Sequence, residues 1–333
     1  MDTPARHAAN AVSACPICGA AAALRHGGMY DDRYGYPGLF EVRRCATCGH
    51  CHTGAQFDSA GLSDLYTRYY PRAAFQVDQY RVPPESHGIG GWWSGERCAA
   101  FRWIPRGVRV LDIGCGVCET LGYHQSRGCE VYGVEADENV RRIAEQYGFD
   151  VRVGLFDADA YPREFFDYVT LDQVIEHMAD PLTVMRGVAK ALKPGGVAVV
   201  STPNSGGWGA RVFGRKWINW HVPYHLQHFT RRSMALLAAN AGLSVTGART
   251  LTHSDWMFFQ FAHLLGVPDP GGRHPFWSGE KWRTPRQDRI FLAVARMRRL
   301  GLFQAATRLF DALGLGDNLL FFLQKPPADA GAG

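Results

Sequence analysis

Residues 108–116 read Val-Arg-Val-Leu-Asp-Ile-Gly-Cys-Gly, an apolar run that contains one acid and ends in two alternating glycines. The part 108–113 is too short for a helix and rich in β-branched residues, so it predicts a strand buried on both faces of a parallel sheet. Gly114 and Gly116 can adopt backbone angles closed to other residues and let a ligand approach the main chain. We expect a helix over 118–127, whose N-terminus would lie beside the bound molecule.

The next predicted strand, 130–134, ends at a second acid. Glu135 follows this strand 23 positions after Asp112, where a carboxylate can accept hydrogen bonds from both hydroxyls of a ribose. A solvent-exposed acid at a strand end is the plainer alternative. Dinucleotide-binding enzymes need a third glycine three residues after the second, and this position is Glu119. The loop therefore disfavours an NAD-linked oxidoreductase, which would use the same sheet.

The acid-first loop with two glycines resembles the first motif of class I S-adenosylmethionine-dependent methyltransferases. Residues 176–181 resemble the "EH…DP" segment of the methyltransferase group that contains ubiquinone-biosynthesis enzymes, and 193–196 (Lys-Pro-Gly-Gly) and 202–204 (Thr-Pro-Asn) follow in the order of that group. The resemblance implies an α/β fold with a seven-stranded Rossmann-like sheet and helices on both faces. The further strands are expected at 151–153, 166–172, 197–201, 243–251 and 319–323, the last of them antiparallel, and residues 193–196 are expected to form a turn before the strand at 197–201. The crossover helices are expected at 140–147, 182–192 and 231–241, with Thr230 as the N-cap of the last.

The resemblance also implies that S-adenosylmethionine is the methyl donor. Its expected contacts lie at the ends of the strands: Asp112, Gly114, Gly116, Glu135, Phe156, Asp157, Asp172 and Gln173. Phe156 and Asp157 would flank the adenine. A core phenylalanine beside a helix-capping aspartate is the alternative for this pair.

Two CxxC turns near the N-terminus predict a metal site. Cys15, Cys18, Cys45 and Cys48 supply four thiolates, which suits a tetrahedral structural Zn²⁺ that helps a small module to fold. His50, Cys51 and His52 are spare candidates if one cysteine does not bind, and four unrelated buried cysteines are the alternative. Similar zinc modules precede the catalytic domain in certain deoxysugar C-methyltransferases.

Residues 223–229 (Pro-Tyr-His-Leu-Gln-His-Phe) resemble the "P-H-L-x-H-F" substrate loop of the family. This resemblance makes His225 and His228, with His177 of the "EH" pair, the candidates for a general base, since imidazole suits proton transfer at neutral pH. The histidine spacing also suggests metal ligands, but Pro223 would interrupt the helix needed to align them. Plain loop structure remains the third interpretation.

The composition excludes several classes of protein. The chain has 333 residues and 46% hydrophobic residues, enough for one large α/β domain and a smaller module. Its net charge of +5 does not indicate a specific nucleic-acid partner. No apolar run approaches the roughly 18 residues that cross a bilayer, and the first residues do not resemble a secretory signal. An odd number of cysteines, nine, favours reduced thiols, so we expect a cytoplasmic protein.

These patterns predict a domain organisation with irregular chain at 71–91 and helical segments at 57–70 and 92–105. A basic helix at 281–300 is interpreted as a contact for an anionic carrier or a membrane surface, with a solvated amphipathic helix as the alternative. The predicted divisions are a disordered N-terminus (1–14), a zinc-binding module (15–56), connecting and lid helices (57–105), the methyltransferase core (106–252), a helical insertion (253–315), the final core strand (316–327) and a disordered tail (328–333).

The resemblance implies O-methylation of a small-molecule or carrier-linked acceptor. A C-methyltransferase acting on a nucleotide-linked deoxysugar is the alternative that the zinc module favours. A noncatalytic zinc-dependent interaction protein would keep the CxxC turns but has no need for the whole set of motifs from Asp112 to Asn204.

Overall fold

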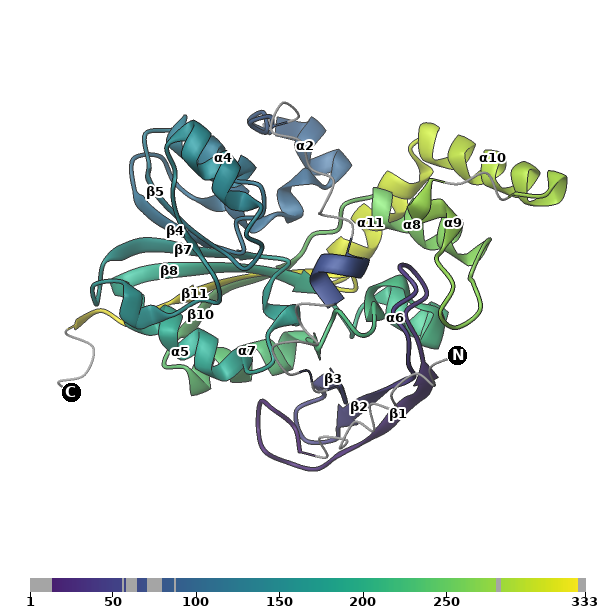
Figure 1. Ribbon diagram of the computed structural model, residues 1–333, viewed down its shortest axis with the longest axis horizontal. Coiled ribbons are helices and arrows are strands. Elements are labelled where there is room, and N and C mark those ends of the chain that lie inside the picture. The colour runs from purple at the N-terminus through teal and green to yellow at the C-terminus, as the bar shows by residue number, and fades with distance from the viewer. Residues whose placement is uncertain are drawn as a thin grey trace.

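The computed structural model describes residues 14–55, 57, 65–70, 80–86, 88–279 and 283–328. The two predicted disordered ends fall almost entirely outside these ranges, as does most of the segment 58–79. Figure 1 shows one large twisted sheet between helices, a small N-terminal sheet below it and a group of helices at one end.

The large sheet has seven strands in the order β10-β11-β8-β7-β4-β5-β6. Strand β11 runs antiparallel to both of its neighbours, while β4, β5, β6, β7 and β8 pair in parallel. The sheet confirms the predicted Rossmann-like fold. Its strands are β4 (Arg109–Ile113), β5 (Glu130–Glu135), β6 (Asp150–Val153), β7 (Phe166–Asp172), β8 (Leu192–Pro203), β10 (Ser244–Thr250) and β11 (Asn318–Gln324).

Helices cover both faces of this sheet, as predicted. Helix α4 lies on one face and helices α5 and α7 lie on the other (Figure 1). The predicted N-cap of α7 is confirmed, because the Thr230 hydroxyl accepts from the Ser233 N–H and Ser233 reciprocates in a capping box. The helices are α3 (Glu119–Gln125), α4 (Val140–Tyr147), α5 (Pro181–Ala191) and α7 (Arg231–Asn240).

The predicted buried strand lies at the centre of the core. Leu111 and Ile113 on β4 are at most 1% exposed, and so are Leu171 on β7 and Val200 on β8. Because β4 is covered by side chains on both faces, its continuous apolar sequence has no solvent side to satisfy. This burial places the glycine loop that follows β4 at the carboxyl edge of the sheet, where open α/β sheets bind ligands.

Strand β8 is longer than predicted. The residues 193–196 were expected to form a turn, but Leu192 already pairs with Phe166 and the strand continues to Pro203. The register shifts between Phe166 and Tyr168, so the Lys-Pro-Gly-Gly segment forms an irregularity within the strand. The prediction of a separate turn was wrong because pairing with β7 begins before it.

The single helix predicted over 92–105 is also wrong, and so is the irregular chain expected up to residue 91. Three short helices replace them. Gly95 separates the first from the second, because it has a left-handed φ of 85° that ends the α-helix. The helices are α2 (Gly88–Ser94), η4 (Glu96–Cys98) and η5 (Ala100–Trp103), the last two being 3₁₀-helices.

The N-terminal strands form a second sheet, which also includes a short strand from residues 227–228, late in the sequence of the core. Its order is β1-β2-β3-β9, with all pairs antiparallel. Strand β9 is Gln227–His228, and it adds the predicted substrate loop to the N-terminal module. The other strands are β1 (Ala22–Met29), β2 (Phe40–Cys45) and β3 (Cys51–Thr53).

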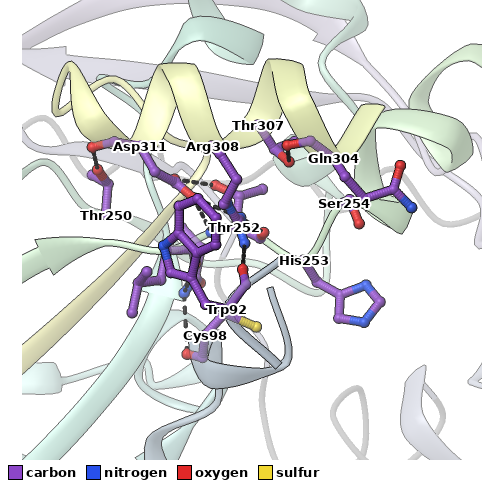
Figure 2. A network of polar contacts seen from close by, with 12 residues as sticks. Trp92, Cys98, Thr250, Thr252, His253, Ser254, Gln304, Thr307, Arg308 and Asp311 are labelled. Atoms are coloured by element: carbon purple, nitrogen blue, oxygen red, sulfur yellow. Dashed lines mark hydrogen bonds and ion pairs between the residues drawn. The ribbon is translucent and has the colours of Figure 1, made fainter. Parts of the chain in front are cut away.

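The described residues of the predicted helical insertion form four helices, which lie at one end of the sheet (Figure 1). Figure 2 shows how a buried arginine fastens them to the core: the Arg308 guanidinium donates to the carbonyl oxygens of Trp92 and Thr252 and to Asp311. The helices are α8 (Asp255–Leu264), α9 (Pro275–Ser278), α10 (Pro285–Arg299) and α11 (Leu302–Ala312).

Shorter elements complete the described chain. They are the π-helix η1 (Leu65–Tyr69), helix α6 (Trp208–Phe213) and the 3₁₀-helices η6 (Ala158–Ala160), η7 (Ile175–His177), η8 (Gly214–Lys216) and η9 (Ile218–Trp220). Within the described ranges, none of the helices combines the length and apolar character needed to cross a bilayer.

Substitution of Gly95 tests the close approach of the end of α2 to Thr252. A Cβ atom at Gly95 would lie 2.1 Å from the Thr252 carbonyl oxygen, so we expect Gly95→Ala to lower the free energy of unfolding by about 2–4 kcal/mol. Gly107 also has a positive φ, of 70°, but no atom lies within 4 Å of its Cβ position. Gly107→Ala should cost only about 1 kcal/mol. Equal losses in urea unfolding would contradict the proposed clash.

Candidate functional site at the carboxyl edge of the sheet

The loop after β4 has the geometry that its glycines predict. Gly114 and Gly116 have φ values of 76° and 57°, which favour glycine. A Cβ atom at Gly114 would lie 2.5 Å from the Val174 side chain, so a larger residue does not fit. The amides of Gly114 and Cys115 donate to the Val134 carbonyl oxygen at 2.7 and 3.1 Å. The loop is therefore held as a tight turn against the end of β5.

Glu135 lies beside this loop. Its side chain is buried, with Oε2 accepting from the Gly116 amide at 2.8 Å and Oε1 accepting from the Asp137 amide at 3.1 Å. The carboxylate thus sits between the ends of β4 and β5 in a fixed orientation. The plainer alternative of a solvent-exposed acid does not describe it.

Asp112 lies beneath the glycine loop. One carboxylate oxygen accepts from Thr170 Oγ1 at 2.6 Å, and the other accepts from Thr120. Burial raises the pKa of Asp112 to about 7, although both hydroxyls favour the charged form. The acid joins β4 to β7 and to the first turn of α3.

Asp172 and Gln173 connect three strands where β7 ends. Asp172 accepts from the Ala100 amide at 3.1 Å and from Ser201, and burial raises its pKa. The Gln173 amide nitrogen donates to Ser201 Oγ at 3.0 Å and to Asn318 Oδ1 at 2.8 Å. These bonds align the ends of β7, β8 and β11.

Phe156 and Asp157 adopt the geometry of a packing phenylalanine and a capping aspartate. Phe156 packs on the buried core beside Gly187 of α5, and Asp157 accepts from the Asp159 amide at 2.9 Å. The predicted adenine contact of this pair stays a prediction. Leu155, which the sequence did not single out, has a 77% exposed side chain directly after β6.

The four cysteines of the CxxC turns come together in space. Sulfur–sulfur distances are 3.5 Å for Cys15–Cys48, 3.5 Å for Cys18–Cys45 and 3.6 Å for Cys18–Cys48. Thiolates on one tetrahedral Zn²⁺ at about 2.3 Å would lie roughly 3.8 Å apart. The cluster therefore has the size and ligand set of a closed tetrahedral site.

The two CxxC turns share one backbone design. The glycine that follows each turn donates to the carbonyl oxygen of the first cysteine, at 2.9 Å from Gly19 and 3.0 Å from Gly49. Both glycines have positive φ, of 71° and 77°. The predicted spare ligands lie elsewhere: Cys51 and His52 are on β3, and His50 Nε2 pairs with the Gln227 side chain at 2.9 Å.

The predicted substrate loop is built into the N-terminal sheet. His228 pairs with Cys51 in the β3–β9 ladder, and its Nε2 lies 3.1 Å from Thr53 Oγ1. The Thr53 hydroxyl donates to the His225 carbonyl oxygen at 2.7 Å, so the His228 Nε2–H donates to Thr53. No helix spans residues 223–229, so the helical alignment of histidines that the sequence disfavoured does not form.

His177, His225 and Glu176 converge at the end of β7. The rings of His177 and His225 are 4.8 Å apart in an edge-to-face contact. Glu176 is 1% exposed, and Thr202 Oγ1 donates to its Oε2 at 3.0 Å. Burial raises the pKa of Glu176 to about 8 and lowers the pKa of His225 well below its ordinary value. Both side chains are therefore largely uncharged at neutral pH.

Sequence reasoning assigned no role to Glu176, although it lies in the quoted "EH" motif. The signal was present, because an acid followed by histidine in an apolar context has no ordinary structural explanation. Its partner Thr202 also lay within a quoted motif, but their contact joins β8 to the segment after β7. Only the order of strands in the sheet brings those two motifs together.

The raised pKa of Asp112 predicts that the free energy of unfolding depends on pH. The unfolded chain loses this proton near pH 4, whereas the folded protein keeps it to about pH 7, so the folded state loses stability as pH rises through this window. Asp112→Asn removes that loss. Relative to the wild type, we expect the variant to gain about 2–4 kcal/mol in urea unfolding between pH 4 and pH 7.5. The exposed Asp150→Asn serves as control; equal profiles for all three proteins would contradict the prediction.

Comparisons with known proteins agree with this geometry. A family model described as a methyltransferase domain matches residues 93–247. The ubiquinone biosynthesis O-methyltransferase of Ruegeria pomeroyi is 42% identical over 104 residues, which cover 29% of this chain and 42% of that protein. The Bordetella avium protein of the same name is 27% identical over 212 residues, covering 55% of this chain and 88% of its own.

The match to the Ruegeria protein thus covers less than half of that relative. Among solved structures, phosphoethanolamine N-methyltransferase 2 of Haemonchus contortus superposes with a TM-score of 0.49 at 17% identity, covering 83% of this chain and 62% of that chain. The fold is defined here by the sheet order itself, which ends in the antiparallel β11. With their glycine loop, the matched residues 93–247 form a class I S-adenosylmethionine-dependent methyltransferase domain.

Proposed function

We propose that this methyltransferase transfers the methyl group of S-adenosylmethionine to a hydroxyl oxygen of a small-molecule or carrier-linked acceptor. The observation that carries the proposal is the convergence of Glu176, His177 and His225 at the edge of the sheet that also bears the glycine loop. A side chain that removes a hydroxyl proton belongs at this edge. The relatives from Ruegeria pomeroyi and Bordetella avium are named O-methyltransferases, which agrees with oxygen as the acceptor atom.

The cofactor would lie across the ends of β4, β5 and β6. The remaining lone pairs of the Glu135 carboxylate would accept from the two ribose hydroxyls, and the glycine loop would leave room for the methionine portion. The exposed Leu155 would cover the adenine from the end of β6, together with Phe156 and Asp157. Asp112, Asp172 and Gln173 would hold the loop and strand ends in place.

A methyl sulfonium is already activated, so positioning the acceptor accounts for most of the acceleration. In the transfer step a histidine nitrogen accepts the hydroxyl proton, and the oxygen forms a bond to the methyl carbon. The carbon–sulfur bond breaks, and its electron pair stays on sulfur as S-adenosylhomocysteine. His177 and His225 suit this step, because each Nδ1–H donates to a backbone carbonyl oxygen and leaves the lone pair on Nε2.

His228 is less suited to be the base. Its Nε2–H is engaged by Thr53, and its ring packs edge-on against Trp220 at 4.9 Å. We therefore assign His228 to holding the substrate loop on the N-terminal sheet, and the proton transfer to His177 and His225.

C-methylation of a nucleotide-linked deoxysugar is the second candidate. The four-cysteine cluster supports it, because the deoxysugar enzymes that this chain resembles carry such a module. The two reactions differ in their product: a methyl ether is cleaved by boron tribromide, whereas a methyl group on carbon is not. Boron tribromide treatment of the product labelled by a radioactive methyl donor therefore separates the two candidate reactions.

We also infer that Cys15, Cys18, Cys45 and Cys48 hold a structural Zn²⁺. Four thiolates leave no open position for a substrate, so the ion would act through folding and not through chemistry. The cysteines pack in the same hydrophobic cluster as helix α7, and the Asn240 side chain donates to the Ile17 carbonyl oxygen at 2.9 Å. Zinc binding would thus stabilise the core as well as the module.

The basic helix remains a proposed contact for an anionic carrier or a membrane surface. Helix α10 projects at the outer edge of the insertion (Figure 1). Leu292 is 65% exposed, and Arg298 pairs with Asp255 through two bonds of 2.7 Å. The arginines exposed along α10 are Arg286, Arg289, Arg296, Arg298 and Arg299.

Glu135 tests the methyl-donor pocket. We expect Glu135→Gln to weaken S-adenosylmethionine binding by about 10- to 100-fold in calorimetry, because a charged acceptor for the ribose hydroxyls is lost. With labelled methyl donor and a fractionated cell extract, the wild type should label a low-mass acceptor and the variant should label it far less at low donor concentration. The exposed neighbour Glu138→Gln should behave as the wild type. Unchanged affinity in Glu135→Gln would refute the pocket.

Cys48 tests the zinc inference. Cys48→Ser removes one of four ligands, so we expect the zinc content of the purified protein to fall from about one to near zero and the melting temperature to drop. Cys51→Ser is the matched control: Cys51 is equally buried but accepts from Arg25 outside the cluster. If Cys48→Ser retains its zinc, or if the wild type has none, the inference fails.

A further inference from the structure

We propose that Glu176, His177 and His225 form a binding site for a divalent transition-metal cation, separate from the four-cysteine cluster. One ligand atom of each side chain lies within 4.8 Å of the other two. Atoms bound to a single ion at about 2.1 Å lie roughly 3–4 Å apart, so side-chain shifts of about 1 Å would close the site on an ion. Two imidazoles and a carboxylate are a known ligand set for Zn²⁺ and Fe²⁺.

Both histidines are oriented as metal ligands usually are. His177 Nδ1 lies 2.9 Å from the Tyr224 carbonyl oxygen, and His225 Nδ1 lies 2.9 Å from the Asn219 carbonyl oxygen. A carbonyl oxygen can only accept, so both rings carry hydrogen on Nδ1 and their lone pair on Nε2. Hydrogen bonds of this kind fix the tautomer and ring orientation of metal-binding histidines.

Glu176 is an independent indication of a ligand. Its side chain is 1% exposed; Oε2 accepts from Thr202, but Oε1 has no hydrogen-bond partner among the described residues. A buried carboxylate oxygen without a partner is costly. A cation bound by the two imidazoles next to it would supply the missing partner.

Three protein ligands leave coordination positions open, as catalytic metal sites do. The site lies at the end of β7, next to the glycine loop, since Val174 contacts the Gly114 position. With the cation bound, the Nε2 lone pairs of both histidines would serve as ligands and not as the base. The cation would then make a bound acceptor hydroxyl more acidic than in water, so that its proton leaves to solvent. This role rests on the proposed O-methylation; binding of the cation does not.

Cobalt titration separates the two metal sites. Co²⁺ at the cysteine cluster produces sulfur-to-metal charge-transfer absorption, whereas Co²⁺ bound by nitrogen and oxygen produces only visible ligand-field bands. We expect metal-free wild-type protein to bind two equivalents of Co²⁺, one of each spectral type. Glu176→Gln and His225→Gln should each lose the nitrogen–oxygen equivalent and keep the charge-transfer bands. Glu176→Gln keeps side-chain volume and the Thr202 contact, so it should remain folded.

His221→Gln is the matched control. Its ring lies 4.9 Å from that of His225 in the same loop, but it does not belong to the three-residue cluster. This variant should still bind two equivalents. The proposal is overturned if the wild type shows no equivalent without charge transfer, or if His221→Gln loses that equivalent as the other variants do. Failure of methyl transfer to hydroxyls would instead refute the proposed function and leave the cobalt count unchanged.

Discussion

The two-residue pairing of β3 with β9 is the constraint on which the substrate side of the molecule depends. It joins Cys51 to His228, which are 177 positions apart, and it adds the substrate loop to the sheet that carries the cysteine turns. Because His225 lies just before β9, the pairing also sets where its ring meets His177. The N-terminal module therefore contributes to the proposed acceptor site and is not merely appended to the core.

The methyl-donor side depends on a different constraint, the parallel pairing of β4 with β5 and β7. This pairing brings the glycine loop, Glu135 and the end of β7 to one edge. The buried Asp112 then ties β4 to β7 through Thr170, at the cost of a raised pKa. The paired strands and the loop fixed by β9 set the separation of the proposed donor and acceptor regions, which a transfer reaction governed by positioning requires.

Uncharged buried acids and histidines distinguish the acceptor side. Glu176 and His225 are both driven toward their neutral forms by burial, and His221 likewise has a pKa well below its ordinary value. The neutral imidazoles keep a lone pair, and Glu176 Oε1 has no hydrogen-bond partner among the described residues. Burying a polar group without a hydrogen-bond partner costs folding free energy, so a role in stability alone would not favour these side chains at this position.

Much of the sheet could be predicted from the sequence. The bounds of α4 and β7 agree with the expectation from apolar periodicity, because one buried face imposes a period that local sequence records. The glycine loop and the cap of α7 could likewise be predicted, since each depends on neighbours close in the chain, and the spacing within each CxxC turn indicated the four cysteines. The break in the helix predicted over 92–105 could not be predicted. It lies at Gly95, where Thr252, far along the chain, approaches too closely for a side chain to fit.

By itself, the sequence determined most strands of the large sheet, the tight turn after β4 and the identity of the four clustered cysteines. Only the tertiary structure decided that Glu176, His177 and His225 meet, because Glu176 follows β7 while His225 is placed by pairing with the N-terminal sheet. Local patterns record which residues are buried. They do not record which buried polar groups face each other across elements whose order in space differs from their order in the chain.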